Sequence, residues 1–270
     1  MPSTTELLEI AATVARRAGA LALQRRRDGV EVAASKSTIT DIVTRADRES
    51  EDLIRNALAA ARPRDGFLGE ESGAEHGTSG LTWVVDPIDG TVNYFYDIPA
   101  WAVSVAVVEG EPDPATWRTL VGAVVNPVTA EVFTAAAGAG ARLNGAPIQV
   151  NSGVDLPLAL VGTGFGYDPE KRRKQAAFVT ELIPRVRDIR RIGAASLDLC
   201  SVACGRLDAY YERGLNPWDH AAGALIAQEA GARLGGLGAA PAGAELLVTA
   251  APDLFEQLDP LVQGYYSHWE

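Results

Sequence analysis

The sequence is poor in the two residue types that most often bind zinc or cross-link small folds. It contains two cysteines, Cys200 and Cys204, and three histidines. A structural zinc site needs four Cys or His ligands, and a disulfide framework needs several cysteine pairs. The sequence therefore favours neither. We expect both cysteines to be buried on one face of a helix, and the missing disulfide framework fits a reducing cytoplasm.

Long apolar runs are also missing. No stretch approaches the roughly 20 apolar residues that are needed to span a bilayer. Near the N-terminus, Glu6, Glu9, Arg16 and Arg17 interrupt any apolar segment that could serve as a signal peptide. We therefore expect a soluble, cytoplasmic protein.

Positive charge is scarce. The chain has 24 Lys and Arg residues against 35 Asp and Glu residues, which gives a formal net charge of −11. Nucleic acids and anionic membranes are bound through clustered basic residues, and no such stripe is present. The sequence therefore predicts neither as a partner, and an acidic protein that handles phosphate would need bound metal as its local source of positive charge.

Two glycine patterns for nucleotide binding are incomplete. Gly162 and Gly164 begin a dinucleotide-like pattern, but Tyr167 stands where its third glycine belongs. Lys36-Ser37 is similar to the end of a P-loop, yet Val30 and Ser35 occupy both glycine positions. The P-loop is thereby rejected, and an NAD-dependent dehydrogenase remains only a weak alternative.

The 270 residues can form one large domain or two close lobes with a substantial core. Hydrophobic periodicity predicts helices over 4–27 and 45–61 in the first half. The strand-like runs cover 30–32, 82–85, 101–108, 119–125 and 131–135, with a polar turn at 35–38. Asn144-Gly145 gives the strongest hairpin signal. The first half therefore predicts an antiparallel sheet with two helices.

In the second half, strand-like and helical segments alternate. The strands are expected at 158–163, 188–191 and 209–212, and the helices at 169–183, 196–204 and 219–230. This alternation predicts a second, mixed sheet with flanking helices. We therefore predict an α+β fold, a layered αβαβα sandwich, with lobes 1–150 and 151–270 in one cooperative unit.

Two aspartates follow an apolar strand-like run at Trp83–Val85. Asp86 ends the run, Pro87 interrupts the strand, and Asp89 comes directly before Gly90 and Thr91. Carboxylates are ligands that Mg²⁺ prefers, and backbone N–H groups at a turn or helix start can bind phosphate. Each aspartate on its own has another interpretation: Asp89-Gly90 would be a turn pair, and Asp86 would be a capping residue at the end of the strand.

The run from Trp83 to Phe95 resembles the Asp-Pro-Ile/Leu-Asp-Gly-Thr-x-Asn-Phe/Tyr signature of the inositol monophosphatase family, which are magnesium-dependent, lithium-sensitive phosphatases. The resemblance implies that Asp86 and the Ile88 carbonyl bind one metal ion, and that Asp86 and Asp89 bind a second. It also implies that the N–H groups of Gly90 and Thr91 bind phosphate.

Two further segments are similar to the family's metal-binding motifs. Glu70-Glu71 follows a strand end; it could be an exposed loop pair, but the resemblance implies that Glu70 binds metal with Glu71 beside it. Asp219 precedes a small-residue apolar helix and could be its N-cap. The segment from Trp218 resembles the family's Trp-Asp-x-Ala-Ala-Gly motif, whose aspartate binds the second metal.

The segment from Lys36 through Asp41 to Asp47 also resembles the family. There the last aspartate hydrogen-bonds the threonine of the aspartate motif, here Thr91, and helps to orient the attacking water; Lys36 supports the site from behind. The alternative interpretation of this segment is a capping region for the second helix.

The resemblance also points to residues that would contact substrate. Glu212 corresponds to a glutamate that contacts substrate hydroxyls, although it could be a surface charge at a strand end. Ser196 replaces the usual alanine of a stretch that lines the substrate pocket, and Asp89 and Asp219 would also touch substrate. The loop 109–118 is longer than the family norm.

These assignments imply hydrolysis of a small phosphate monoester, foremost inositol monophosphate, by direct attack of water with two or three Mg²⁺ ions per active site. Glu70, Thr91 and Asp47 would activate the water, without a covalent phosphoenzyme. The alternatives are histidinol phosphate, fructose 1,6-bisphosphate or a 3'-phosphonucleotide as substrate, or a non-catalytic sugar-phosphate or metal-binding module. Relatives of this kind are commonly homodimers, so we expect one here.

Overall fold

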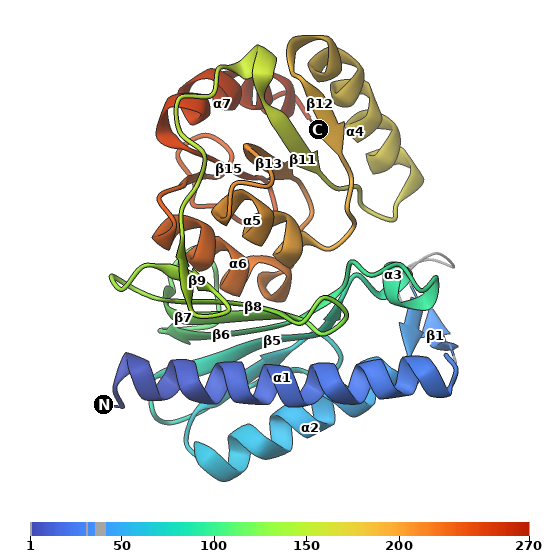
Figure 1. Ribbon diagram of the computed structural model, residues 1–270, viewed down its shortest axis with the longest axis vertical. Coiled ribbons are helices and arrows are strands. Elements are labelled where there is room, and N and C mark those ends of the chain that lie inside the picture. Colours follow the sequence, from blue (N-terminus) through green and yellow to red (C-terminus); the bar gives the residue numbers. More distant parts are fainter. Residues whose placement is uncertain (1, 31, 36–41, 270) are drawn as a thin grey trace.

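The computed structural model describes residues 2–30, 32–35 and 42–269. Its helices and sheets alternate as αβαβα layers, which confirms the predicted fold class (Figure 1). The outer helices α1 (Thr4–Asp28) and α2 (Arg45–Ala61) cover one face of the first sheet. The inner helices α5 (Ala195–Ala203) and α6 (Pro217–Glu229) separate the two sheets.

The first sheet has eight strands in the order β10-β9-β8-β7-β6-β5-β3-β4. These strands are β3 (Gly66–Gly69), β4 (Gly73–Glu75), β5 (Leu81–Asp89), β6 (Ala102–Glu109), β7 (Arg118–Asn126), β8 (Glu131–Ala136), β9 (Ala141–Leu143) and β10 (Ala146–Ile148). A short helix, α3 (Thr91–Phe95), follows β5, and β1 (Val32–Ser35) pairs with β2 (Ile42–Thr44).

The second sheet has five strands in the order β12-β11-β13-β15-β14. These are β11 (Leu160–Thr163), β12 (Asp188–Arg190), β13 (Ala209–Glu212), β14 (Arg233–Gly235) and β15 (Leu247–Ala250). The helices α4 (Pro169–Leu182) and α7 (Pro252–Tyr266) pack on its outer face. The 3₁₀ turns η1 (Leu156–Leu158) and η2 (Ile183–Arg185) precede β11 and follow α4.

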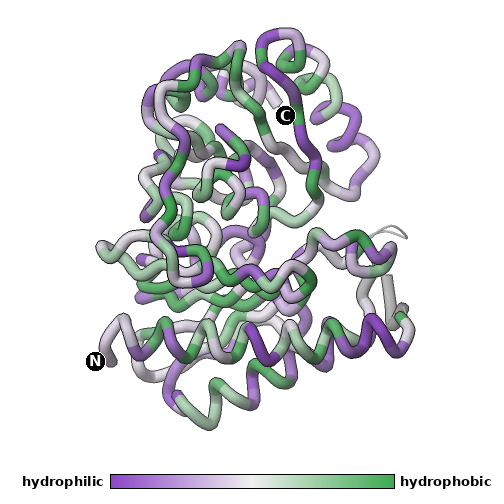
Figure 2. Tube along the Cα trace, in the orientation of Figure 1, coloured by the Kyte–Doolittle hydropathy of each residue, from purple (hydrophilic) through white to green (hydrophobic). Residues whose placement is uncertain are grey.

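The central strands are buried on both faces because helices cover both sides of the first sheet. All nine residues of β5 are buried, and so are all residues of β6 and β7 except Glu109, Arg118 and Thr119. Strands covered on both faces read as continuous apolar runs rather than as alternating ones. Figure 2 shows this distribution: hydrophobic segments follow the strands, and hydrophilic residues gather on outer helices such as α4.

Most predicted elements are confirmed, but the first sheet is not wholly antiparallel. Strand β3 runs parallel to β5, whereas β5 through β10 form an antiparallel series. The strand end expected before Glu70 is confirmed as β3, whereas β2, β4, α3, β14, β15 and α7 were not predicted from the sequence. Of the strand predicted at 30–32, only Val32 lies in a strand. Glu31, and Lys36–Thr38 of the predicted turn, lie outside the described residues.

The prediction for the cysteines is half correct. Cys200 is fully buried inside α5, whereas Cys204 is the C-cap of that helix and is partly exposed. Both are free thiols. Within the described ranges, no helix is long and apolar enough to cross a membrane.

The inner helical layer belongs to both halves of the chain. One apolar core contains Val124 and Phe133 of the first sheet, Leu199 and Ile226 of the inner helices, and Leu247 of the second sheet. The first sheet ends at Ile148 and the second begins at Leu160. The division into lobes near residue 150 stays a prediction.

Candidate active site

The end of strand β5 carries Asp86 and Asp89, both buried, at 2% and 8% exposure. The pairing of β5 with β6 shifts register between these two residues. Such an irregularity changes the direction in which side chains point. The carboxylate Oδ1 of Asp86 accepts a hydrogen bond from the Ile88 N–H at 3.0 Å, which holds the turn around Pro87.

Glu70 reaches the same place because β3 is parallel to β5. It directly follows β3, and its N–H donates to the Val85 carbonyl at 3.2 Å. The carboxyl ends of parallel neighbours lie at one edge of a sheet. The Glu70 and Asp86 side chains consequently lie close enough for the charge of Glu70 to raise the pKa of Asp86, in addition to the effect of burial.

Asp219 comes to the cluster from the first turn of α6. The N-cap of this helix is Asn216, whose N–H donates to Oδ2 of Asp219 at 2.7 Å. Asp219 is therefore the third helical residue in a capping box, which corrects the alternative that it is the N-cap itself. Its second oxygen is left for other contacts.

The electrostatics show that these four carboxylates converge. Burial raises the pKa of Asp86 and of Asp219 well above the usual range for aspartate, and negative charge on Glu70 and Asp89 raises both further. Burial also raises the pKa of Asp89, to about 6, although donors on Ser196 hold it down. Acidic groups from three distant segments therefore oppose one another in one buried place.

The donor chemistry of this cluster fits Mg²⁺, which takes oxygen ligands and would relieve the repulsion. Within the described part of the chain, no three Asp, Glu, His or Cys side chains are arranged to hold one metal.

Asp47 and Thr91 lie together, as the sequence predicts. Thr91 Oγ1 lies 3.3 Å from Oδ1 of Asp47 and 3.1 Å from the Ile88 carbonyl oxygen, so its proton can be donated to either. Oδ2 of Asp47 accepts from the N–H of Thr44 at 2.8 Å, in the capping box of α2. Burial raises the pKa of Asp47 to about 7. The capping role and the contact to Thr91 thus use different oxygens.

Gly90 occupies a position that only glycine fits. Its φ is +92°, in the left-handed region, and a Cβ there would lie 3.0 Å from the Ala100 carbonyl oxygen. It caps α3, so the Thr91 N–H lies at the start of that helix. Asp47, Thr91, Ser196 and Asp219 thus all lie in the first turns of helices, namely α2, α3, α5 and α6.

A family model described as the inositol monophosphatase family matches residues 3–259 of the chain. The chain belongs to the inositol monophosphatase family. Inositol-1-monophosphatase SuhB of Mycobacterium tuberculosis is 46% identical over 266 residues, covering 93% of this chain and 88% of that protein. Nus factor SuhB of Escherichia coli is 39% identical over 231 residues, covering 83% of each. The solved structure of Mycobacterium tuberculosis SuhB is 42% identical, with a TM-score of 0.83 over 98% of each chain.

Membership in the inositol monophosphatase family makes this chain a phosphoric monoester hydrolase. The partly exposed members of the site are Glu70, Gly90, Thr91, Glu212 and Asp219. The buried members are Asp47, Asp86, Ile88, Asp89 and Ser196. The first group is therefore accessible from solvent, and the second group lies behind it. Lys36 and Asp41 lie outside the described residues.

Ser196 lies behind Asp89. Its N–H and its hydroxyl both donate to Oδ2 of Asp89, at 2.7 and 2.5 Å, and the side chain is fully buried. The sequence predicts that Ser196 touches substrate. The structure places its hydroxyl against a carboxylate of the cluster.

Glu212 ends strand β13 and accepts a hydrogen bond from the Tyr210 hydroxyl. Burial raises the pKa of Glu212 to about 7, although this bond and the charge of Arg191 hold it down. A Cβ at Gly164 would overlap the Glu212 carboxylate, so the glycine-rich strand exit makes room for this side chain.

Two acidic residues near the site were missed from the sequence. Asp198 on α5 is 1% exposed; burial and the charges of Glu212 and Asp89 raise its pKa well above the usual range. Glu51 on α2 is also buried, and its Oε2 accepts the Glu71 N–H at 2.8 Å, beneath the segment that carries Glu70. Glu51 lies on the buried face of α2, and Asp198 lies in a helix that is buried throughout; an acidic residue among apolar ones in a helical segment is the signal that could have indicated either.

Two cavities formed by the described residues lie away from the carboxylates. A cavity of about 630 Å³ lies between α4 and α7 and is lined by Phe178, Tyr265 and Trp269, among others. A second, of about 220 Å³, lies where α1, α2 and α3 meet and includes Thr44. Neither cavity is lined by any of the four carboxylates. The candidate active site is therefore defined by the carboxylates and not by a cavity.

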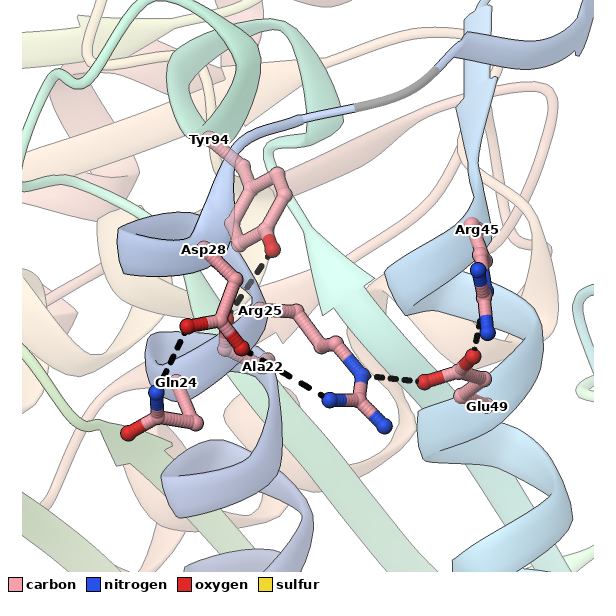
Figure 3. A network of polar contacts seen from close by, with 7 residues as sticks. All are labelled: Ala22, Gln24, Arg25, Asp28, Arg45, Glu49 and Tyr94. Carbon is pink, nitrogen blue, oxygen red and sulfur yellow. Dashed lines mark hydrogen bonds and ion pairs between the residues drawn. The ribbon is translucent and has the colours of Figure 1, made fainter.

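A polar network next to the second cavity joins three helices (Figure 3). Arg25 of α1 bonds Glu49 of α2, and Arg45 contacts the other oxygen of Glu49 at 2.5 Å. Tyr94 of α3 donates to the Ala22 carbonyl at 2.9 Å. The network fixes the start of α2, and hence Thr44 and Asp47, relative to α1.

Proposed function

We propose that this protein is a Mg²⁺-dependent phosphatase that hydrolyses a small phosphate monoester, with inositol monophosphate as the first candidate substrate. The observation that carries the proposal is the meeting of Glu70, Asp86, Asp89 and Asp219, which come from three distant segments. Such a buried set of negative charges is costly without cations. Their arrangement beside helix-start N–H groups suits phosphate chemistry.

We assign the Mg²⁺ ligands as the sequence predicts. Glu70, Asp86 and the Ile88 carbonyl would hold one ion, and Asp86, Asp89 and Asp219 a second; a third ion per site remains part of the prediction. When bound, the ions would neutralise charge on the phosphoryl group and stabilise the attacking and departing oxygens.

The remaining steps belong to side chains and backbone of the chain. The N–H groups of Gly90 and Thr91 bind the phosphate oxygens. Thr91 Oγ1 hydrogen-bonds the attacking water and passes a proton toward Asp47, whose pKa of about 7 suits a general base at neutral pH. Glu70 lies beside the same water. Glu212 and Asp219, on the accessible side, hold hydroxyl groups of the alcohol.

Phosphate release across a panel of esters tests the proposal. The panel contains inositol 1-phosphate, histidinol phosphate, fructose 1,6-bisphosphate and a 3'-phosphonucleotide, each with Mg²⁺ and with a chelator. We expect Mg²⁺-dependent release that is fastest from inositol 1-phosphate. Faster release from another ester would change the substrate and keep the chemistry; no release from any ester would leave the binding-module alternative.

We also infer a cytoplasmic homodimer, supported only by the family resemblance and by the residues that argue against a signal peptide. Light scattering on the purified protein measures the mass directly. A monomer at micromolar concentration would contradict the inference about assembly and leave the proposed chemistry unaffected.

A further inference from the structure

The first turn of α5 holds the Asp89 carboxylate, mainly through Oδ2. The Ser196 N–H and hydroxyl donate to Oδ2 at 2.7 and 2.5 Å, and the Ala195 N–H also bonds this carboxylate. Asp89 and Ser196 are 107 residues apart, and both are buried. The donors therefore come from the inner helical layer, whereas the acceptor is at the end of a strand in the first sheet.

These bonds restrict what Asp89 can do. A carboxylate oxygen has two lone-pair sites, and at Oδ2 the Ser196 N–H and hydroxyl fill both. Only Oδ1 can then contact an ion or a substrate. The same bonds fix the rotation of the carboxylate, because two donors on one residue set both its position and its plane.

We propose that Ser196 is a positioning residue: its hydroxyl fixes Asp89 so that Oδ1 alone serves as a ligand, which strengthens Mg²⁺ binding. The inference rests on the proposed function, because it takes Asp89 as a metal ligand. It assigns Ser196 no contact with substrate. Residues that hold a metal ligand in place commonly change metal affinity by 10–100-fold when replaced.

The test compares Ser196→Ala with Ser201→Ala, the same substitution later in the same helix, at a serine whose hydroxyl bonds none of the described carboxylates of the cluster. Calorimetric titration with Mg²⁺ should show binding about 10-fold weaker for Ser196→Ala and unchanged for Ser201→Ala. The thermal midpoint in a chelator should stay within a few degrees of wild type, because the N–H donor remains. If Ser196→Ala does not fold, Ser196→Cys, with similar volume and a weaker donor, gives the same comparison.

Kinetics separate positioning from substrate contact. For Ser196→Ala we expect a higher Mg²⁺ concentration at half-maximal activity, with the KM for the ester unchanged at saturating Mg²⁺. A raised ester KM with unchanged Mg²⁺ affinity would overturn the inference, and so would equal Mg²⁺ affinities for the two alanine variants.

The two claims can fail separately. A wild-type protein that binds Mg²⁺ but hydrolyses no ester would contradict the proposed function, while weaker Mg²⁺ binding by Ser196→Ala would still support the role of Ser196. A wild-type protein that binds no Mg²⁺ would overturn both.

Discussion

At the scale of single residues, Asp47, Asp89 and Asp219 share one arrangement. Each uses Oδ2 to accept bonds that fix local structure, from Thr44, Ser196 and Asn216 respectively. The other oxygen of each can face the site. A carboxylate can serve a helix or loop and a ligand together because its two oxygens are separate acceptors.

Replacing Asp89 by asparagine tests this division. The amide keeps one oxygen acceptor but loses the negative charge that a cation needs, so we expect phosphate release to fall by at least about 100-fold. Asp52→Asn, at an exposed position of α2, is the control and should leave release unchanged. Activity of Asp89→Asn within a few fold of wild type would argue for the binding-module alternative.

The raised pKa of Glu212 predicts how the stability of the fold depends on pH. Its pKa in the folded protein is about 7, above that of an exposed glutamate, so the folded state binds its proton more tightly than the unfolded state does. Its contribution to stability is complete below the unfolded pKa and is lost as pH rises through about 7. In a chelator, wild-type protein should lose on the order of 2 kcal/mol more than Glu212→Gln between pH 5 and pH 8.

Chemical denaturation of both proteins at each pH measures this difference. Carboxyl groups that do not feel the charge of Glu212 contribute the same trend to both proteins, and the comparison cancels them. Asp198 and Asp219 do feel that charge, so the measured difference belongs to Glu212 together with its coupling to these two groups. Parallel pH profiles for the two would show that Glu212 titrates normally in the folded state.

At the scale of elements, α6 is positioned by direct contact with strand β7. A Cβ on Gly122 would lie 2.8 Å from the Ala222 carbonyl oxygen and 2.9 Å from its Cα, so helix backbone lies directly on the strand. The same helix carries Asp219. Close packing of backbone against backbone therefore sets the height of Asp219 above the sheet.

Gly122→Ala should push α6 away from β7. We expect a loss of about 1–3 kcal/mol in the free energy of unfolding, as is typical of overpacking, and weaker Mg²⁺ binding through Asp219. Gly264→Ala, in α7 with open space around it, is the control and should be neutral or slightly stabilising. Equal stability of the two variants, measured by denaturant titration, would contradict this account of the packing.

At the scale of the whole molecule, the inner helices join both sheets through one core. We therefore propose that the two lobes unfold together. Far-ultraviolet and near-ultraviolet circular dichroism should give one coincident transition. Two separated transitions, or a stable isolated fragment 151–270, would show that the lobes are independent.

Magnesium should stabilise the whole molecule. An ion that binds only the folded state adds about 2.7 kcal/mol for each site at a concentration 100 times its Kd. We expect the thermal midpoint to rise with Mg²⁺ and to return to its initial value with chelator. K⁺ at equal ionic strength is the control, and an equal rise with K⁺ would indicate general screening instead.

The sequence predicts what is local. Asp86 and Asp89 follow an apolar run and lie on either side of Pro87, so a short pattern identifies them. Long segments with helical periodicity, such as α1 and α2, are predicted equally well. The parallel pairing of β3 with β5 is not local, and it is what brings Glu70 to Asp86. Pairing across sequence depends on the packing of the whole sheet, so no short pattern reveals it.

The burial of polar side chains could not be predicted from the sequence either. Asp198 and Glu51 look like surface charges until the elements around them are assembled, and the bond from Ser196 to Asp89 joins different layers. Helix α7 was missed although it has 15 residues, since Pro260 and Gly264 interrupt its pattern. Its stability comes from packing on the second sheet and not from intrinsic propensity.

The four helices that begin around the carboxylates have one more consequence. A helix start carries a partial positive charge of about half an elementary unit, and its free N–H groups attract anions. Four carboxylates lie at the same spot, so these dipoles would attract phosphate esters there only once bound Mg²⁺ neutralises the carboxylates; the acidic protein would then guide esters to this one spot while it repels them over most of its surface. Adding salt should blunt the repulsion elsewhere more than this short-range attraction, so capture of the ester should survive high ionic strength.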